Sequence, residues 1–198
     1  MPNAATDGAL SALPITVGTF SGYAISSHTF VDPDDESRTR RIRSPLGQAL
    51  FEYRYQGRTE HLAMLAKTFG KAIHECFGLR KEKIDRLCMV PPHIGRPEYP
   101  RMIALSGAIC TAASIASAQC AILNKTEYRA GQESAETFYA DKAKLFSLPS
   151  EKSVSLIKNC RLLVIDDLFR SGSTLSRCCA TLQQGRPHSI HLLVGTKI

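Results

Sequence analysis

Two adjacent carboxylates, Asp166 and Asp167, directly follow an apolar run at residues 162–165. The run has the composition of a buried strand, and open α/β sheets bind their ligands at the carboxyl ends of such strands. Neighbouring strand residues point to opposite faces, but a turn of the chain at the strand end would let both side chains reach one ligand. A carboxylate pair in this position suits a sugar diol and a hydrated divalent cation. We therefore predict that Asp166 and Asp167 bind such a ligand.

A short polar segment at 170–174 follows the carboxylates and precedes a helix that we expect to begin at Leu175. Gly172 permits a tight turn in which successive backbone N–H groups converge on an anion, and the helix N-terminus adds about half a positive charge. The hydroxyls that complete the cradle belong to Ser171, Ser173 and Thr174. An ordinary helix N-cap also favours Ser and Thr. The order of apolar strand, acidic pair, glycine and hydroxyls favours a phosphate-binding loop instead.

Four apolar runs in the second half of the chain predict the sheet that must position these residues. They lie at 86–90, 119–123, 161–165 and 189–195. The clearest helices are expected at 102–116 and 173–184, between or after these runs. A longer helical pattern at 45–77 is interrupted at Gly57. Strands that are apolar on both faces and joined by helices indicate a parallel sheet with flanking helices, so the predicted fold class is α/β.

The first 44 residues differ in composition from the rest of the chain. Residues 1–19 are small and polar without a period and predict a loose arm, whereas 20–31 have the composition of a small β element. We therefore separate an N-terminal part at 1–44 from a main domain at 45–198. An acidic run here directly precedes four arginines, Arg38, Arg40, Arg41 and Arg43. These arginines belong either to a solvated loop whose field the carboxylates cancel or to a patch that contacts a polyanion.

The overall composition sets broad limits on the class of protein. A chain of 198 residues that is 43% hydrophobic can bury one substantial core. Its net charge of +7 suits nucleic acid or phosphorylated small molecules equally. Seven cysteines occur without a CxxC pair or a zinc-like spacing, so we expect free thiols, no structural zinc and no disulfide. Because the start lacks a leader pattern and no apolar run reaches about 18 residues, we expect a soluble cytoplasmic protein with no membrane partner.

The segment RLLVIDDLFRSGSTL at 161–175 resembles the phosphoribosyl pyrophosphate signature of type I phosphoribosyltransferases. Three looser matches extend the resemblance to the ComF-like branch, which is associated with DNA uptake: YRYQGRTEHLAMLA at 53–66, RLCMVPPHIGR at 86–96 and ADKAKLF at 140–146. Gln56 stands where that branch usually has lysine, and the zinc-binding cysteine module with which such proteins often begin is absent. The resemblance covers about 45–198 and implies the type I fold, with a small N-terminal hood and a flexible flap.

The resemblance also implies two further parts of the site. A pyrophosphate loop is expected at 91–96, where main-chain N–H groups and Arg96 hold the leaving group, with Pro92 and His93 beside it. An ordinary surface turn is the alternative for this loop. A flap is expected at 126–148, which would close over bound substrate and exclude water. Its cationic candidates are Arg129, Lys142 and Lys144, although any one of them can equally be a solvated surface residue.

The activity implied by the resemblance is displacement of pyrophosphate from phosphoribosyl pyrophosphate by a nitrogen nucleophile. Magnesium would bridge the pyrophosphate and the ribose hydroxyls, Asp166 and Asp167 would bind those hydroxyls, and Arg96 would stabilise the leaving group. Arg170 stands where the family usually has a small hydroxyl residue and where hypoxanthine-guanine enzymes have an aspartate. We therefore expect Arg170 to contact phosphate or an anionic partner. The alternative is a guanidinium that points into solvent or pairs with a carboxylate.

Two functions of other classes stay open at this point. The first is a binding module that senses a phosphoribosyl compound or nucleotide without turnover and acts through a protein partner. The second is an accessory protein associated with nucleic acid, for which the net charge of +7 gives weak support. Each of these functions allows a homodimer, and the accepting base cannot be read from the chain.

Overall fold

A six-stranded sheet lies at the centre of the part of the chain that the structure, a computed structural model, describes: residues 12–78, 83–92, 96–119 and 146–198. Its order is β1–β2–β8–β7–β5–β6. The strands are β1 (Leu13–Val17), β2 (Phe20–Ser27), β5 (Arg86–Met89), β6 (Ala116–Ser117), β7 (Arg161–Phe169) and β8 (Ser189–Lys197). Every neighbouring pair is parallel except β1 and β2. The predicted α/β fold with a mostly parallel sheet is confirmed.

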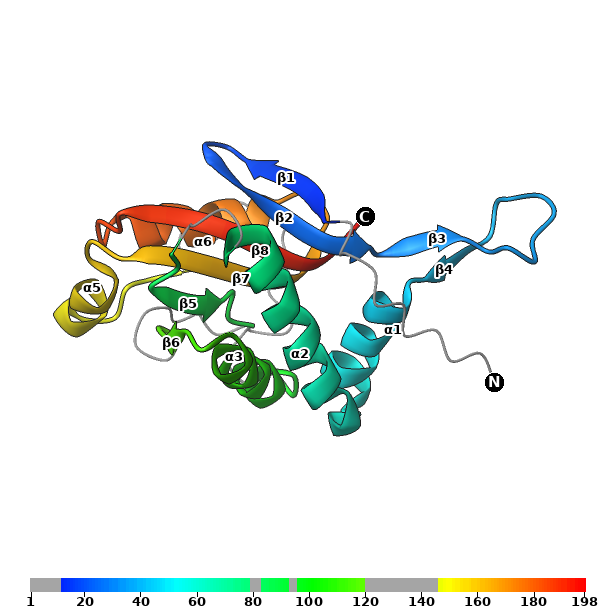
Figure 1. Cartoon of the computed structure of the whole chain (residues 1–198), viewed down its shortest axis with the longest axis horizontal. Coiled ribbons are helices and arrows are strands. Elements are labelled where there is room, and N and C mark those ends of the chain that lie inside the picture. Colours follow the sequence, from blue (N-terminus) through cyan, green and yellow to red (C-terminus); the bar gives the residue numbers. More distant parts are fainter. Residues whose placement is uncertain (1–11, 79–82, 93–95, 120–145) are drawn as a thin grey trace, which may run out of the picture.

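Helices cover both faces of this sheet (Figure 1). The α-helices are α1 (Pro45–Phe51), α2 (Leu62–Ile73), α3 (Tyr99–Ala113), α5 (Glu151–Ile157) and α6 (Ser173–Gln183). In β7, Leu163 and Ile165 pack with α1, α2 and α3, whereas Leu162 and Val164 pack with α5 and α6. This alternation explains why the strand is apolar without interruption.

The helical pattern at 45–77 divides into α1 and α2, as its break at Gly57 predicts. A π-helical turn (Glu52–Gln56) continues α1 and ends at Gly57, whose φ is 73°. A 3₁₀ turn (Thr59–His61) leads into α2, and a second π-helical turn (His74–Gly78) follows it. Gly57 is suited to this place because its left-handed backbone disfavours residues with a Cβ.

The prediction of a loose arm is wrong for residues 13–17, which form β1. This strand pairs antiparallel with β2, and Ile15 and Val17 are buried on the face that α6 covers. The predicted β element at 20–31 is confirmed, but it has two parts. β2 joins the main sheet beside β8, whereas β3 (Thr29–Val31) pairs with β4 (Arg41–Arg43) in a separate ribbon.

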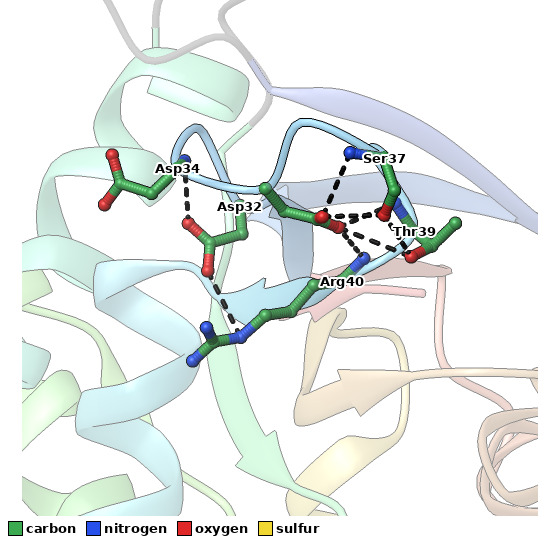
Figure 2. A network of polar contacts seen from close by, with 6 residues as sticks. Asp32, Asp34, Ser37, Thr39 and Arg40 are labelled. Carbon is green, nitrogen blue, oxygen red and sulfur yellow. Dashed lines mark hydrogen bonds and ion pairs between the residues drawn. The ribbon is translucent and has the colours of Figure 1, made fainter.

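The β3–β4 ribbon projects from the body of the molecule, and a polar network holds its connecting loop (Figures 1 and 2). Asp35 accepts hydrogen bonds from the hydroxyl and backbone amide of Ser37 at 2.6 and 3.1 Å, and from the amides of Thr39 and Arg40. These bonds, that from the Ser37 hydroxyl foremost, lower the pKa of Asp35 to about 2. Arg40 Nε lies 3.2 Å from Asp32 Oδ2. The carboxylates of the acidic run therefore compensate part of the arginine charge locally.

The far edge of the sheet is described only in part. α3 ends at Ala113, three residues before its predicted end, and the short strand β6 at 116–117 precedes the predicted run at 119–123. Gln119 is buried beyond β6, and its side-chain amide donates to the carbonyl of Met89 at 2.8 Å and accepts from the amide of Met89. The Gln119 side chain thus pairs with the backbone of Met89 at the end of β5, where the backbone of a further strand residue would otherwise pair. Residues 120–123 lie outside the described residues.

Replacing Gln119 with alanine is expected to lower the free energy of unfolding by about 2 kcal/mol. The substitution leaves a buried N–H and a buried C=O of Met89 without a partner. Urea unfolding followed by circular dichroism measures the change, with Gln184→Ala at an exposed helix end as the control. Equal effects of the two substitutions would contradict the role given to Gln119.

No disulfide joins the described cysteines, and most of them are buried: Cys76, Cys88, Cys110, Cys160, Cys178 and Cys179. Burial raises the pKa of Cys88 and of Cys179 to about 12. Both thiols are therefore poor nucleophiles in the folded protein. Cys120 lies outside the described residues. Among the described helices, none has the length and apolar character needed to span a bilayer.

Candidate functional site

The two carboxylates of the predicted site lie within β7 and not at its end. The strand continues to Phe169, so the turn expected at the acidic pair does not occur there. The alternation of side chains is therefore kept. Asp167 points to the face covered by α1 and contacts Arg54, whereas Asp166 borders the loop that leads into α6. Both carboxylates nevertheless line one cavity, and Asp166 also lines a smaller cavity at that loop.

Asp167 forms a buried ion pair with Arg54, which belongs to the π-helical turn after α1. Arg54 Nη1 donates to Oδ1 of Asp167 at 2.7 Å and to Oδ2 at 2.6 Å. The Arg54 side chain is 21% exposed and that of Asp167 is 11% exposed. Both oxygens of Asp167 are therefore engaged by a cation from the chain itself. Asp167 itself is 8% exposed and belongs to the buried residues.

The backbone of Arg54 is also held. Its carbonyl accepts hydrogen bonds from Nε and Nη2 of Arg101 at 3.1 and 2.7 Å. The hydroxyl of Tyr53, whose ring is buried, donates to the carbonyl of Arg101 at 2.7 Å. α3 and the π-helical turn thus fix each other, and they fix the position from which Arg54 reaches Asp167.

Asp166 has a different environment from its neighbour. Burial, followed by the negative charge of Asp167, raises the pKa of Asp166 well above its ordinary value. Asp166 Oδ1 accepts a hydrogen bond from the amide of Asp167 at 3.0 Å. Two adjacent carboxylates therefore differ in character, because Asp167 has a positive partner and Asp166 is desolvated beside a negative one.

The loop at 170–174 has the geometry expected of an anion-binding turn. Gly172 has a φ of 72° and directly precedes α6, which begins at Ser173, the first residue of the helical pattern predicted at 173–184. Gly172 at the N-cap offers no side-chain acceptor to the first turn of the helix, and the amide of Ser173 donates to the Ser171 hydroxyl at 3.4 Å. The Ser171 hydroxyl donates to the Ser173 hydroxyl at 3.1 Å. A cavity of about 70 Å³ lies here, lined by Asp166, Leu168, Arg170, Ser171, Gly172, Ser173, Thr174 and Leu175.

Replacing Gly172 with alanine is expected to lower the free energy of unfolding by about 1 kcal/mol and to weaken phosphate binding. A Cβ at this positive φ would lie 3.0 Å from Val17 and 3.1 Å from the Phe169 ring. Thermal unfolding and titration with inorganic phosphate measure both effects. Gly107→Ala is the control, because a Cβ at Gly107 in α3 has nothing within 4 Å and alanine favours a helix. A Gly172→Ala protein as stable as Gly107→Ala would contradict this account of the loop.

A larger cavity of about 190 Å³ adjoins the loop and lies between the segment that follows β5 and the acidic pair of β7. Its lining residues are Arg54, Val90, Pro91, Pro92, Met102, Asp166, Asp167, Leu168 and Thr174. The structure therefore brings Pro92 together with the acidic pair. Arg96 is exposed, just before α3, and does not line either of these two cavities. His93 lies outside the described residues.

The predicted flap at 126–148 is described only at its last residues. Its three cationic candidates, Arg129, Lys142 and Lys144, lie outside the described residues. Phe146 is 6% exposed and Leu148 packs against the same cluster, on the face of the sheet covered by α6. The last residues of the predicted flap therefore belong to the core.

The site residue that sequence reasoning missed is Arg54. It stands in the segment YRYQGR, which contributed to the family resemblance without being given a role. The only signal for it was an arginine close to a glycine, at the end of an apolar helix. A role beside Asp167 becomes visible only when the chain folds, because 113 residues separate the two.

Comparison with known proteins finds no matching family model and no matching curated protein. Among solved structures, the chain is similar to the allosteric regulatory enzyme of purine biosynthesis and to the B. subtilis glutamine phosphoribosylpyrophosphate amidotransferase complexed with ADP and GMP. Each match has 16% identity and a TM-score of 0.48, and covers 73% of this chain but 30% of the other. The chain is also similar to Trypanosoma cruzi hypoxanthine phosphoribosyltransferase complexed with IMP, at 15% identity and a TM-score of 0.41, covering 68% and 63% of the two chains.

Proposed function

We propose that this chain binds a phosphoribosyl compound and that it transfers the phosphoribosyl group of phosphoribosyl pyrophosphate to a nitrogen nucleophile. The observation that carries the proposal is the pair of adjoining cavities at the carboxyl end of β7. They share Asp166, Leu168 and Thr174, one opens onto the loop at 170–174, and the other opens onto the acidic pair. A 5-phosphate and its ribose need two adjoining sites, one anion-binding and one diol-binding.

The phosphate end depends on the loop before α6. The left-handed Gly172 lets the backbone turn tightly, and the start of α6, whose N-cap residue has no side chain, supplies amides and a partial positive charge. The hydroxyls of Ser171 and Ser173 lie beside these amides, and Arg170 lines the same cavity. This combination would hold a phosphate dianion through fixed donors rather than through a single flexible side chain.

The ribose end depends on Asp166 and Asp167, which line the larger cavity together with Pro91 and Pro92. Carboxylate oxygens accept hydrogen bonds from sugar hydroxyls, and the prolines let the backbone after β5 lie close to the leaving group. Arg96, farther along that segment, would add positive charge to the departing pyrophosphate. Catalysis of this kind consists of holding the donor in place and stabilising the charge that develops.

The described residues fit magnesium only as an ion that phosphoribosyl pyrophosphate itself carries into the site. They include no group of three or more His, Cys, Asp or Glu side chains suited to a metal, and both oxygens of Asp167 are engaged by Arg54. Asp166 is the remaining carboxylate at the site. Magnesium brought in with phosphoribosyl pyrophosphate would neutralise negative charge on the leaving group.

Calorimetric titration with ribose 5-phosphate, ribose and phosphoribosyl pyrophosphate tests the binding part of the proposal. We expect the two phosphorylated compounds to bind and unphosphorylated ribose not to bind, because the loop amides supply most of the interaction. Failure of both phosphorylated compounds to bind would refute the proposed function.

Release of pyrophosphate tests the transfer part. The protein is incubated with phosphoribosyl pyrophosphate and magnesium, with and without ammonia, simple amines and a panel of nucleobases. We expect pyrophosphate to appear faster in the presence of one of these acceptors. Binding of the donor without release under any condition would favour the sensing module instead. Membership of the ComF-like branch stays a prediction, and salt-dependent binding of DNA is its most direct test.

A further inference from the structure

We propose that Arg54 is the resident cation of the ribose site, occupying the place beside Asp167 that a divalent metal ion would otherwise take. The inference rests on the proposed function and specifies it: the ribose 5-phosphate part of the ligand is recognised without a metal ion. Any magnesium that takes part is then needed only for the pyrophosphate.

The geometry of the pair carries this inference. A single nitrogen of Arg54, Nη1, donates to both oxygens of Asp167, at 2.7 and 2.6 Å. A carboxylate has about four lone-pair positions, so Asp167 keeps acceptor capacity for ribose hydroxyls while its charge is neutralised. Both partners line the larger cavity. The guanidinium therefore lies where a ligand would meet it, and it is not a remote structural contact.

The position of Arg54 is fixed from its backbone as well as from its side chain. Arg101 donates two hydrogen bonds to the Arg54 carbonyl, and the Tyr53 hydroxyl holds the backbone of Arg101. The arginine lies on a π-helical turn, a feature that often marks functional sites. Arg54 Nε is buried and has no hydrogen-bond acceptor among the described residues. The chain thus maintains this placement of the guanidinium although one donor is left unsatisfied.

The positive charge of Arg54 explains why its position beside Asp167 excludes a metal ion there. A divalent cation close to Asp167 would be repelled by a guanidinium that already contacts both oxygens. Asp166 would then be the only carboxylate left for the ion, which is too few ligands for a site formed by the protein alone. An arginine in this position prevents direct coordination and yet keeps the carboxylate oriented for a sugar.

Titration of ribose 5-phosphate in chelator and in magnesium tests the inference on the full chain. We expect the wild-type affinity to change by less than about twofold between the two conditions. Arg54→Met removes the charge but keeps an unbranched stem, and it should weaken binding in chelator by about tenfold. Magnesium should restore most of this loss in the variant, because the ion can then approach Asp167. Arg54→Lys, which keeps the charge, should still bind without magnesium. Arg58→Met is the matched control, since Arg58 pairs with Glu52 away from the cavities.

A second measurement needs no sugar ligand. Mn²⁺, observed by electron paramagnetic resonance, should bind to the Arg54→Met protein and not to the wild type at this site, and Asp167→Asn added to Arg54→Met should abolish that binding. Wild-type affinity for ribose 5-phosphate that requires magnesium, or Mn²⁺ binding that is the same in wild type and Arg54→Met, would overturn the inference. If ribose 5-phosphate binds under neither condition, the proposed function fails instead, and the Mn²⁺ titration still decides the role of Arg54.

Discussion

Replacing Asp167 with asparagine is expected to lower the free energy of unfolding by about 3 kcal/mol. The asparagine amide can accept one hydrogen bond from Arg54 but cannot neutralise it, so a mostly buried guanidinium is left without a counter-charge. The Arg54 side chain is 21% exposed, and solvent therefore compensates only a small part of the loss. Urea unfolding at neutral pH measures the effect. Asp167→Asn in an Arg54→Met background should cost clearly less, because the pair is then already broken.

The neighbouring Asp166 provides the control, since its response should have the opposite sign. Burial raises the folded-state pKa of Asp166 above the unfolded value of about 3.9. Its contribution to stability is therefore complete below the unfolded pKa and is lost as the pH rises through the raised folded pKa. Asp166→Asn, which imitates the protonated acid, should match the wild type in acid and exceed its stability at higher pH. A loss of stability in Asp166→Asn as large as in Asp167→Asn would contradict the separate environments given to the two carboxylates.

The sequence is sufficient to predict the central layers because the signal for them is local. Each of β5, β7 and β8 is an apolar run that needs only its own residues to be recognised, and the helices between them follow from the spacing of apolar side chains. The short strand β1 lacks this signal. It includes Pro14 and becomes a strand because β2 lies beside it and Ile15 and Val17 fill space next to α6. Pairing between strands can therefore determine structure where composition does not.

The candidate site likewise has one part that could be predicted from the sequence and one part that could not. The loop at 170–174 could be predicted because glycine, hydroxyls and helix start are consecutive, and the structure has the expected turn at Gly172. The separation of Asp166 from Asp167 could not be predicted, since β7 continues past both through pairing of Leu168 with Thr196 and of Phe169 with Lys197. Contacts between distant parts of the chain, which decide where a strand ends, have no local sequence signature.

Arg170→Ala is expected to weaken ribose 5-phosphate binding by roughly 10- to 100-fold and to make the remaining affinity less dependent on salt. Arg170 is exposed and lines the small cavity with Ser171 and Thr174, so its guanidinium can form a charge-assisted hydrogen bond to phosphate. Removing such a bond costs about 1.5–3 kcal/mol in binding. Titrations at several salt concentrations measure both quantities. Lys158→Ala is the control, because Lys158 follows α5 near the amino end of β7, opposite the site.

The same residue leads us to expect that the protein does not convert hypoxanthine or guanine to nucleotides efficiently. The hypoxanthine-guanine enzymes that the signature resembles have an aspartate at this place, where a carboxylate can exchange a proton with the purine. An arginine remains protonated at any working pH and cannot act as that base. Incubation with phosphoribosyl pyrophosphate, magnesium and either purine, followed by chromatography of the products, decides the question. Rapid formation of either nucleotide would show that Arg170 does not limit the choice of base, and Arg170→Asp would then be expected to change the rate little.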